Sequence, residues 1–358
     1  MSGNSIGKRF VVTSFGESHG KCVGVVVDGC PSGLQLDENR VQRDLDRRRP
    51  RSGAISTPRK EEDKVEFLSG LMNGRTTGAP ITMLMWNRDA DSTSYDEFRS
   101  KPRPGHADYP ALIRYEGNND YRGGGRFSGR LTAAIVMAGV VAKVYLESKL
   151  VEVFAYTLEV GGIRAKLPEI DKIREIAAKN MMCTPDTEAA EEMIRAVTAA
   201  REEGDSVGGI VECQASGIPP GVGDPIFDSI DADLAKILFD IPAVKGVEFG
   251  IGFEAARLKG SENNDSFIVT EGRIATSTNN AGGVLGGLTY GMPIVVRVAF
   301  KPTPSISKKQ LTVDLKKMET TELEIKGRHD ACIVPRAVPV VEASTAIVLA
   351  DHMLRLAL

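Results

Sequence analysis

The sequence predicts an α+β fold in which antiparallel sheets pack around helices. Short β-branched runs bounded by Gly, Pro or Asn recur along the whole chain, which is typical of strands. Helix-like segments fall between groups of these runs, so the order lacks the alternation of a doubly wound parallel sheet. Glycine-rich loops are spread over more than half the chain, and no internal repeat or low-complexity linker divides it. We therefore expect residues 1–358 to form a single domain around one site.

The elements follow from local pattern. The runs expected to be strands are residues 10–15, 23–27, 80–86, 151–158, 209–215, 267–270 and 294–300. The segments expected to be helices are residues 36–49, 128–149, 187–203, 230–239 and 344–356. In the first expected helix, Val41 and Leu45 are four residues apart and share one apolar face, and Pro50 ends the helix. The second is apolar nearly all round and should therefore be buried.

Composition excludes several classes of protein. The net charge is -3, so no global basic field favours nucleic acid as a partner. The N-terminus shows no apolar segment of the kind that marks a signal peptide. The apolar run 131–142 is too short to span a bilayer, so we expect a buried helix and no membrane partner. Five scattered cysteines without CxxC spacing favour a reduced, cytoplasmic protein, and no metal-ligand spacing is present.

Residues 120–130, DYRGGGRFSGR, carry the strongest local indication of a ligand. The three glycines allow the backbone to approach a bound molecule closely, and Ser128 is a natural N-cap for the helix that follows. A helix N-terminus offers free N–H groups and partial positive charge. Arg122, Arg126 and Arg130 add bidentate donors suited to phosphate or carboxylate. The segment therefore predicts an anion-binding site.

Two histidines lie on glycine-marked turns. Residues 16–20, GESHG, place Ser18 and His19 between two strands, where His19 can donate a proton to an anion near neutral pH. The alternative is a plain polar turn, and a Ser-His nucleophile pair is disfavoured because no G-x-S-x-G elbow exists. Residues 103–109, RPGHADY, place His106 between Arg103 and Asp108, which shift its pKa in opposite directions.

Other cation-rich segments leave two interpretations open. Helix 36–49 and the next residues hold Arg40, Arg43, Arg47, Arg48, Arg49 and Arg51. These arginines either line a solvated charged face or present cations to a polyanion, and a helix C-terminus favours cations without any ligand. Lys301, at the end of a strand, either neutralises a bound anion or is a solvated charge at the sheet end. The density of ionisable groups in residues 326–330, KGRHD, favours a site.

Together these segments resemble the chorismate synthase family. The similarity runs from residue 7 to residue 354, and three blocks carry it. They are FGESHGKCVGVVVDGCPSG (15–33) with DLDRRRP (44–50), RPGHADY with DYRGGGRFSGRLTAA, and KGRHDACIVPRAVPVVEA (326–343). IPAVKGVEFG (241–250), NNAGGVLGG (279–287) and KPTPSIS (301–307) connect them. The resemblance implies a β-α-β sandwich and a homotetramer.

The resemblance also implies the reaction. The family carries out an FMN-dependent anti-1,4-elimination of phosphate from 5-enolpyruvylshikimate 3-phosphate. The product is chorismate, and this is the last step of the shikimate pathway to aromatic amino acids. Reduced FMN is required although there is no net redox change. The substrate carries one phosphate and two carboxylates, which gives the surplus of arginines a purpose.

Roles are carried over position by position. Arg48 and Arg130 are expected to bind the substrate's anions, with Arg49 and Arg126 as second choices. His19 is expected to protonate the departing phosphate. Negative charge develops near N1 of the reduced flavin, so a cation there, or a proton shared with His106, would stabilise that form. By similarity, Asp330 assists removal of the ring C6 hydrogen beside flavin N5, and Ser18 and Ser128 relay protons. The expected FMN contacts are Arg126, Phe127, Ser128, Pro242, Ala243, Gly286, Lys301, Pro302, Thr303, Pro304, Ser305 and Arg328.

Some positions depart from the family pattern. Gly129 replaces a frequent alanine, Phe127 a frequent serine, Ala54 an arginine of some relatives, and Ala331 a frequent proline. The reductant is left open between NADPH in the same site and an external flavin reductase. Two other classes remain as competitors. One is a flavin- or phosphate-binding protein without catalysis, and the other is a nucleic-acid binder that uses the arginine-rich helix.

Overall fold

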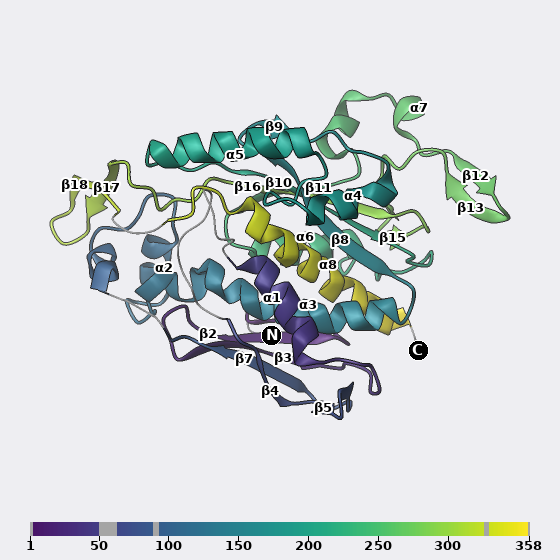
Figure 1. Cartoon of the computed structure of the whole chain (residues 1–358), viewed down its shortest axis with the longest axis horizontal. Coiled ribbons are helices and arrows are strands. Elements are labelled where there is room, and N and C mark those ends of the chain that lie inside the picture. The colour runs from purple at the N-terminus through teal and green to yellow at the C-terminus, as the bar shows by residue number, and fades with distance from the viewer. Residues whose placement is uncertain (1–2, 50–62, 89–92, 326–328, 357–358) are drawn as a thin grey trace.

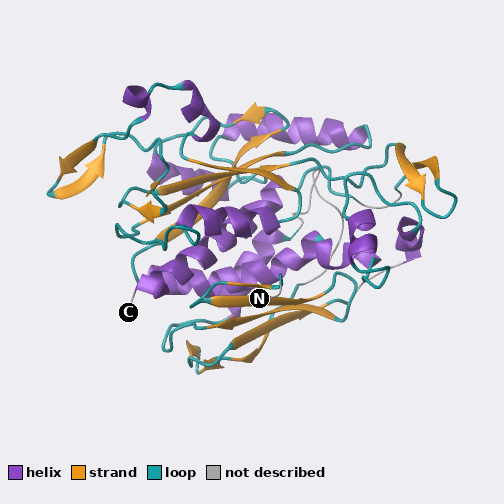
Figure 2. Ribbon diagram, turned by 180° about the vertical axis from the view of Figure 1, so that it is seen from behind, coloured by secondary structure: helices purple, strands orange, loops and turns teal. Residues whose placement is uncertain are grey.

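Two antiparallel sheets enclose a layer of helices (Figures 1 and 2). The structure is a computed structural model that describes residues 3–49, 63–88, 93–325 and 329–356. Each of the two main sheets has five strands, and every strand pairing within them is antiparallel. The predicted α+β sandwich is therefore confirmed.

The first sheet comes from the N-terminal part of the chain. Its order is β1 (Ser5–Ile6), β2 (Val11–Gly16), β3 (Cys22–Asp28), β7 (Ile81–Trp86) and β4 (Glu66–Ser69). Val23, Val25 and Val27 of β3 are fully buried, because alternate side chains of a strand point to the same face. The GESHG turn joins β2 to β3, so Ser18 and His19 lie at one end of this sheet.

The second sheet comes from the middle of the chain. Its order is β11 (Val244–Phe249), β16 (Ile294–Phe300), β10 (Gly209–Ser216), β8 (Glu152–Val160) and β9 (Ile163–Arg164). On its outer side, α4 (Ile170–Ala178) packs Ile173 and Ala177 against Tyr156 and Leu158 of β8. The helix α5 (Thr187–Glu202) lies above the same sheet in Figure 1. Lys301 follows directly after β16 and so leaves the sheet at its end.

Four helices fill the space between the sheets: α1 (Glu38–Arg48), α3 (Thr132–Glu147), α6 (Ile230–Asp240) and α8 (Val334–Leu356). A Cβ placed on Gly139 of α3 would lie 2.2 Å from the Cβ of Ala343. Glycine at this position therefore allows α3 and α8 to cross with their backbones in close approach. The carboxylate of Asp351, near the end of α8, accepts the backbone N–H groups of Lys8 and Phe10 at 2.8 Å. This contact ties the C-terminal helix to the N-terminal strands.

The apolar segments are longer than the sequence suggested. Residues Gly129–Glu147 and Val334–Leu356 are long and apolar enough to cross a membrane by length and composition. This finding corrects the expectation that the run at 131–142 is too short. Buried residues make up 78% of the apolar window in the first and 94% in the second. Both helices lie between the two sheets, as core helices of globular proteins do.

Several boundaries differ from the prediction. The helix expected at 344–356 begins ten residues earlier and includes Pro335 and Pro339. Proline is tolerated in the first turn of a helix because the N–H it lacks has no intrahelical partner there. Pro339 lies further in, where tight packing of the surrounding buried residues compensates for one missing bond. The prediction missed α2 (Asp108–Arg114), α4, β4 and β11, whose short or mixed patterns match no clear period.

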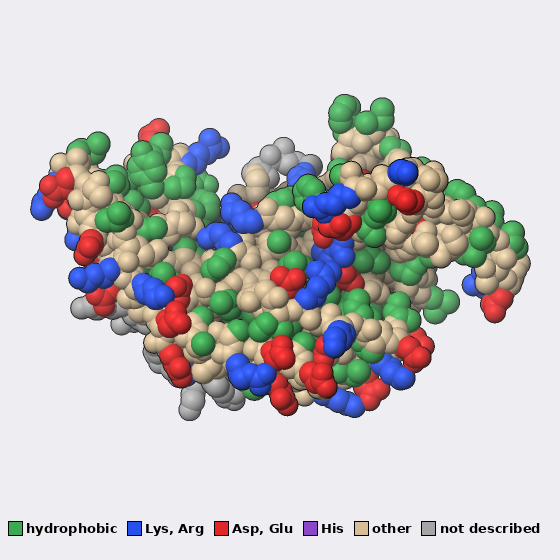
Figure 3. Space-filling model, turned by 90° about the horizontal axis from the view of Figure 1, so that it is seen from above, with side chains coloured by type: hydrophobic (Ala, Val, Ile, Leu, Met, Phe, Trp, Pro, Cys, Tyr) green, Lys and Arg blue, Asp and Glu red, His purple; other side chains and the backbone are tan. Residues whose placement is uncertain are grey.

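Small hairpins lie outside the two sheets. They are β5–β6 (Leu71–Met72 and Arg75–Thr76), β12–β13 (Phe267–Thr270 and Arg273–Thr276), β14–β15 (Val284–Leu285 and Leu288–Thr289) and β17–β18 (Gln310–Asp314 and Glu319–Leu323). The β12–β13 hairpin projects from the body near the short helix α7 (Gly260–Asn263) (Figures 1 and 3). Its apolar side chains Phe267, Val269 and Ile274 are exposed. An isolated hairpin of this length is marginally stable in water.

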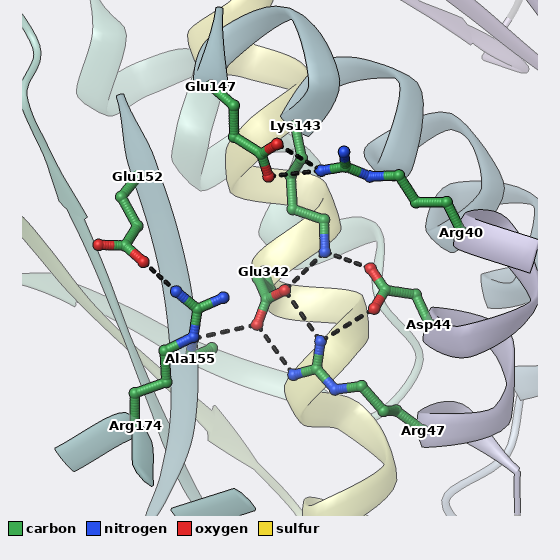
Figure 4. A network of polar contacts seen from close by, with 9 residues as sticks. All are labelled: Arg40, Asp44, Arg47, Lys143, Glu147, Glu152, Ala155, Arg174 and Glu342. Atoms are coloured by element: carbon green, nitrogen blue, oxygen red, sulfur yellow. Dashed lines mark hydrogen bonds and ion pairs between the residues drawn. The ribbon is translucent and has the colours of Figure 1, made fainter. Parts of the chain in front are cut away.

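An ionic cluster joins α1, α3 and α8 around the buried carboxylate of Glu342 (Figure 4). Arg47 donates to both of its oxygens at 3.0 Å, and Lys143 donates to one at 2.7 Å. Asp44 pairs with both of these cations. Burial alone would raise the pKa of Glu342, but Lys143 and Arg47 lower it from 4.5 to about 2. Arg47 thereby fixes the rotation of α1, which decides where its neighbour Arg48 points.

Replacing Glu342 with glutamine is expected to lower the free energy of unfolding by about 3 kcal/mol at neutral pH, because two partly buried cations lose their charged partner. A depressed carboxyl pKa stabilises the fold above its unfolded value, and this contribution is lost as pH falls from 4.5 toward 2. Urea unfolding at neutral and acid pH measures the effect. The control is Glu147→Gln, whose exposed pair with Arg40 should contribute less than about 1 kcal/mol. Equal losses in both variants would contradict the assignment.

Candidate active site

The three-glycine loop contacts Ser18 and His19. Gly123, Gly124 and Gly125 all have positive φ, at 60°, 83° and 53°. A Cβ on Gly123 would lie 2.2 Å from Cδ2 of His19 and 2.7 Å from Oγ of Ser18. The backbone N–H of Ser18 also donates to the carbonyl of Gly125 at 3.3 Å. Glycine is therefore required here because the GESHG turn lies directly against the loop backbone.

The same loop contacts His106 and Ser128. A Cβ on Gly124 would lie 3.3 Å from the His106 ring and 3.7 Å from the Cβ of Ser128. The Ser128 side chain accepts the backbone N–H of Arg130, so its predicted role as an N-cap is confirmed. It caps a short 3-10 turn that leads into α3. The structure thus gathers both histidines and both serines of the predicted site around a single loop.

Asp108 and Arg103 hold His106. Nδ1 of His106 lies 2.6 Å from Oδ1 of Asp108, and Nη2 of Arg103 lies 3.0 Å from the same nitrogen. Arg103 also donates to both Asp108 oxygens, at 2.7 and 2.8 Å. Burial would raise the pKa of Asp108, but hydrogen bonds from Arg103 and His106 hold it well below its usual range. Asp108 is therefore an anion at all relevant pH values and orients the His106 ring.

Tyr95 connects the two histidine turns. Its ring meets His19 edge-on with centroids 5.1 Å apart, and the Arg103 guanidinium lies 5.8 Å from its centroid. Arg103 also lies 4.7 Å from the ring centroid of Phe98, within the range of a cation–π contact. No sequence pattern distinguished Tyr95, because the 3-10 turn Thr93–Arg99 that carries it has no residue spacing typical of a site.

Arg48 and Arg130 meet at a carboxylate that sequence reasoning missed. Both cations are largely buried and pair with Asp63, at 4.0 Å for Arg48 and in a closer contact for Arg130. Nε of Arg130 also donates to Oδ1 of Asn87 at 3.1 Å. The Asn87 amide donates to the carbonyls of Glu17 and Gly20, so it holds the GESHG turn against Arg130. The expected substrate arginines therefore lie together and beside His19.

Asp330 lies between this arginine group and the loop after β16. Arg336 pairs with its Oδ2, and Nε of Arg336 donates to the carbonyl of Arg48 at 3.1 Å. The backbone carbonyl of Asp330 accepts from Oγ1 of Thr303 at 2.8 Å. Its Oδ1 is buried and has no hydrogen-bond partner among the described residues. Arg328, an expected flavin contact, lies outside the described residues, as do Arg51 and Ala54.

The segment after β16 packs against the His106 turn. Nζ of Lys301 donates to the carbonyl of Gly105 at 2.9 Å, and the Lys301 N–H donates to the carbonyl of Ala243 at 2.9 Å. Nη1 of Arg103 donates to Oγ of Ser305 at 3.3 Å. Burial lowers the pKa of Lys301, and the nearby charge of Lys245 lowers it further to a smaller extent. Three expected flavin contacts, Ala243, Lys301 and Ser305, therefore lie together beside the His106 turn.

The side chains of Arg126 and Phe127 make their contacts away from the two histidines. The Arg126 guanidinium donates to the carbonyl of Gly16 at 3.1 Å and to side chains of Asn4 and Ser14 at 2.8 and 2.9 Å. These bonds anchor the loop to the edge of β2. Phe127 is exposed and tilts against Tyr115. Backbone atoms, rather than the Arg126 cation, are therefore what this pair can offer a ligand.

Two expected residues are not brought to the loop. The Arg49 side chain pairs with Asp46 on the partly exposed face of α1. Gly286 lies in the β14–β15 hairpin, whose Gly287 packs against Ser229, the N-cap of α6. Pro242 follows the opposite end of α6, and an 11-residue helix is about 16 Å long. Within one chain, Gly286 is therefore remote from the other expected flavin contacts.

The residues present fit a reduced flavin. Lys301 supplies a cation for a negatively charged ring or phosphate, and the unpartnered Oδ1 of Asp330 is an acceptor for a flavin N–H. Pro302 and Pro304 stiffen the segment beside them. Among the described residues, Lys301 and Asp330 are therefore the groups that could hold the cofactor, while Arg328 lies outside the described residues and Gly286 is remote.

Comparison with known proteins shows the family. The family model described as chorismate synthase matches residues 10–354. The chain belongs to the chorismate synthase family. It is 54% identical over 352 residues to a chorismate synthase of Dehalococcoides mccartyi, covering 98% of this chain and 97% of that protein. It is 55% identical over 355 residues to a chorismate synthase of Methanococcoides burtonii, covering 99% and 97%.

A solved chorismate synthase structure agrees with the fold. It superposes with a TM-score of 0.77 at 31% identity and covers 98% of this chain and 93% of that chain. The family expected from the sequence is confirmed, and with it chorismate synthase as the function and the shikimate pathway as its place. The chain is accordingly a lyase.

A cavity lies away from the glycine loop. An open cavity of about 540 Å3 is lined by Arg40, Arg43, Arg47, Lys143, Glu147, Arg174 and Glu342, among others. It lies at the C-terminal end of α3, whereas the glycine loop precedes the N-terminal end of that helix. The carboxylates that line it are paired with neighbouring cations (Figure 4). The chain's own cations therefore neutralise these carboxylates without a ligand.

Proposed function

We propose that the glycine loop is the shared floor of a site that eliminates phosphate from 5-enolpyruvylshikimate 3-phosphate and requires reduced FMN. The observation that carries this proposal is the convergence of Ser18, His19, His106 and Ser128 on the loop, with Arg48 and Arg130 next to it. Acid groups and paired cations at one loop suit the departure of an anion from carbon. Residues 1–358 act as one domain in this proposal.

Phosphate departure takes place at the arginine side. Arg48 and Arg130 neutralise the developing charge, which is most effective where the cations are largely buried. His19 donates the proton to the leaving oxygen, and Asn87 keeps its turn against Arg130. Ser18 and Ser128 pass protons along the loop. Arg49, held by Asp46, stays a second choice for a substrate carboxylate.

The flavin side comprises the loop 301–305, Ala243 and Asp330. When bound, reduced FMN supplies electron density to the allylic system and is returned unchanged. Lys301 binds and orients the cofactor, while His106, fixed by Asp108, holds a proton next to it. Asp330, through its unpartnered oxygen, assists removal of the C6 hydrogen. Arg126, Phe127 and Ser128 contribute backbone contacts.

Anaerobic turnover tests the proposal. The purified protein is mixed with 5-enolpyruvylshikimate 3-phosphate and dithionite-reduced FMN, and chorismate absorbance and free phosphate are followed together. We expect both products in equal amounts, and neither with oxidised FMN. Bound flavin without product would instead support a binding protein without catalysis. Repeating the assay with NADPH in place of dithionite decides between an intrinsic and an external flavin reductase.

Replacing Lys301 with alanine is expected to weaken FMN binding about tenfold or more, because the cation and its anchor to Gly105 are lost together. His19→Ala should leave the same affinity within about threefold, because His19 lies on the substrate side of the loop. Quenching of flavin fluorescence measures both. A stronger effect of His19→Ala than of Lys301→Ala would contradict the division of the site into two sides.

We propose a cytoplasmic homotetramer. The β12–β13 hairpin projects from the body (Figure 3). Together with the exposed Ile226, Phe227 and Phe253, it offers apolar surface that a second copy can cover. An assembly would also explain why Gly286 is remote from the other expected flavin contacts of its own chain. In an assembly, the Gly286 of a second copy can reach a flavin bound to the first copy. Sedimentation at several concentrations tests the assembly, and a monomer at all of them would oppose it.

A further inference from the structure

One guanidinium contacts both sides of the proposed site. Nε of Arg336 donates to the carbonyl of Arg48 at 3.1 Å, and its Nη1 pairs with Oδ2 of Asp330. Arg48 ends α1 on the substrate side, and Asp330 lies beside the loop after β16 on the flavin side. The side chains of Arg336 and Asp330 are 28% and 14% exposed, so water and salt screen their ion pair only in part.

The position of Arg336 within α8 does not favour a cation. It is the third residue of this helix, and the N-terminus of a helix carries partial positive charge. The first turn of α8 holds no acidic residue that would offset the arginine. The carbonyl of Arg48 is instead among the last four of α1, which lack partners within that helix and favour a cation. Arg336 therefore opposes the dipole of its own helix and completes the end of another.

The two contacts of Arg336 fix the Asp330 carboxylate relative to α1. A guanidinium is planar and presents its donors in a rigid fork, so bonds to two partners set the angle between them. The backbone of Asp330 is held separately, because its carbonyl accepts from Oγ1 of Thr303 at 2.8 Å. Arg336 occupies Oδ2, while the buried Oδ1 has no hydrogen-bond partner among the described residues. One carboxylate oxygen is thereby anchored, and the other is available to a ligand.

We propose that Arg336 is a positioning residue that joins the two sides of the site, because it anchors Asp330 for the flavin side and holds the end of α1 that carries Arg48. The proposal rests on the proposed function, which assigns Arg48 to the substrate and Asp330 to removal of the C6 hydrogen. Arg336 itself contacts neither substrate nor cofactor. Its loss should therefore act on the flavin side through Asp330 and on the substrate side through Arg48.

Binding of FMN in the absence of substrate tests the flavin side. Reduced FMN carries an N–H at N5 that Oδ1 of Asp330 can accept, and oxidised FMN carries none there. Arg336→Met keeps the length of the side chain and removes its donors. Reduced FMN should then bind about tenfold more weakly, the loss typical of a hydrogen bond to a charged group, while oxidised FMN stays within about twofold of the parent. Anaerobic titration followed by flavin absorbance measures both affinities, and equal changes in the two forms, or none, would contradict the anchoring of Asp330.

Turnover separates action through Asp330 from action through Arg48. Asp330→Asn should lower kcat about tenfold or more with an unchanged KM for 5-enolpyruvylshikimate 3-phosphate. Arg336→Met should lower kcat to a similar extent and also raise KM about threefold, because the end of α1 is released. Groups that act as a unit are not additive, so the double variant should keep kcat within about threefold of Asp330→Asn alone. Losses in kcat that multiply would overturn the action through Asp330, and an unchanged KM in Arg336→Met would overturn the link to Arg48.

The matched control is Arg355→Met on the same helix. Arg355 pairs with Asp351 and Asp233, and its side chain is 13% exposed. It lies about 28 Å further along α8 at a rise of about 1.5 Å per residue. Because sites this far apart share no partner, kcat and both FMN affinities should stay within about twofold of the parent. A control that reproduces the pattern of Arg336→Met would assign the effect to general loosening of α8 and overturn the proposal.

Arg336→Lys covers the case in which Arg336→Met does not fold, as judged by thermal unfolding. Lysine keeps the charge without the fork, so it can hold Asp330 or the carbonyl of Arg48 but not both in the same geometry. We expect reduced FMN to bind about threefold more weakly and kcat to fall about tenfold. Parent-like values of both would overturn the proposal. Absence of chorismate from the parent protein would instead remove the proposed function, while the comparison of the two FMN forms would still test the anchoring of Asp330.

Discussion

Replacing His19 with alanine is expected to lower chorismate formation about a hundredfold or more, the loss typical of a missing general acid. His19 is placed for this role because it lies against Gly123 and edge-on to Tyr95, in the turn that Asn87 holds against Arg130. Phosphate is a poor leaving group from an allylic carbon unless its charge is neutralised as the bond breaks. Steady-state turnover with reduced FMN measures the effect.

The matched control is His106→Ala. It should also lose about a hundredfold, but through the flavin side, because His106 is held by Asp108 and Arg103 next to the 301–305 loop. Weakened FMN binding is therefore expected in His106→Ala and not in His19→Ala. Thermal unfolding checks that both variants are folded. Turnover close to that of the parent protein in His19→Ala would remove it from the role of phosphate acid.

A methyl group on Gly123 is expected to be nearly as damaging as the loss of a histidine. In Gly123→Ala the new Cβ would lie 2.2 Å from one ring carbon of His19 and 2.5 Å from its Nε2. Such contacts require the ring or the loop to move, and a displacement near 1 Å at a reacting group costs about a hundredfold in rate. We therefore expect kcat to fall about a hundredfold with the protein still folded.

Two other glycines separate the possible causes. Gly129→Ala, in the same segment, adds a methyl group with no atom within 4 Å and should keep turnover within about threefold. Gly162→Ala shares the positive φ, at 83°, but lies in a hairpin away from the site and also meets no atom within 4 Å. Its cost should appear as about 1 kcal/mol of stability and not as lost turnover. Equal turnover in Gly123→Ala and Gly129→Ala would show that the loop is not the floor of the site.

The features predicted correctly from the sequence are those that depend on residues close to one another in the chain. Glycines between arginines indicated the anion loop, Ser128 indicated a cap, and alternating apolar residues indicated β16 and β10. These features depend on neighbours within a few residues. The helix α8 was found only in part because the prolines in its first half hide the helical pattern, and burial between two sheets overrides that local preference.

The residues that the prediction missed contact partners that are far away in the sequence. Asp63 pairs with Arg130 at a separation of 67 residues, and Arg336 reaches the carbonyl of Arg48 over 288 residues. No periodicity or motif spacing encodes such pairs in one sequence. The position of Gly286 could not be foreseen for the same reason, since only the packing of Gly287 against Ser229 places it at the far end of α6.

The most direct test of the shared loop is a crystal structure of the protein with 5-enolpyruvylshikimate 3-phosphate and oxidised FMN. We expect the substrate's phosphate within hydrogen-bond distance of Arg48 and Arg130, and the flavin ring beside Lys301, His106 and Asp330. The glycine backbone at 123–125 should lie between the two ligands and the body of the protein. Substrate or flavin bound elsewhere, for example in the cavity beside Glu342, would contradict the account.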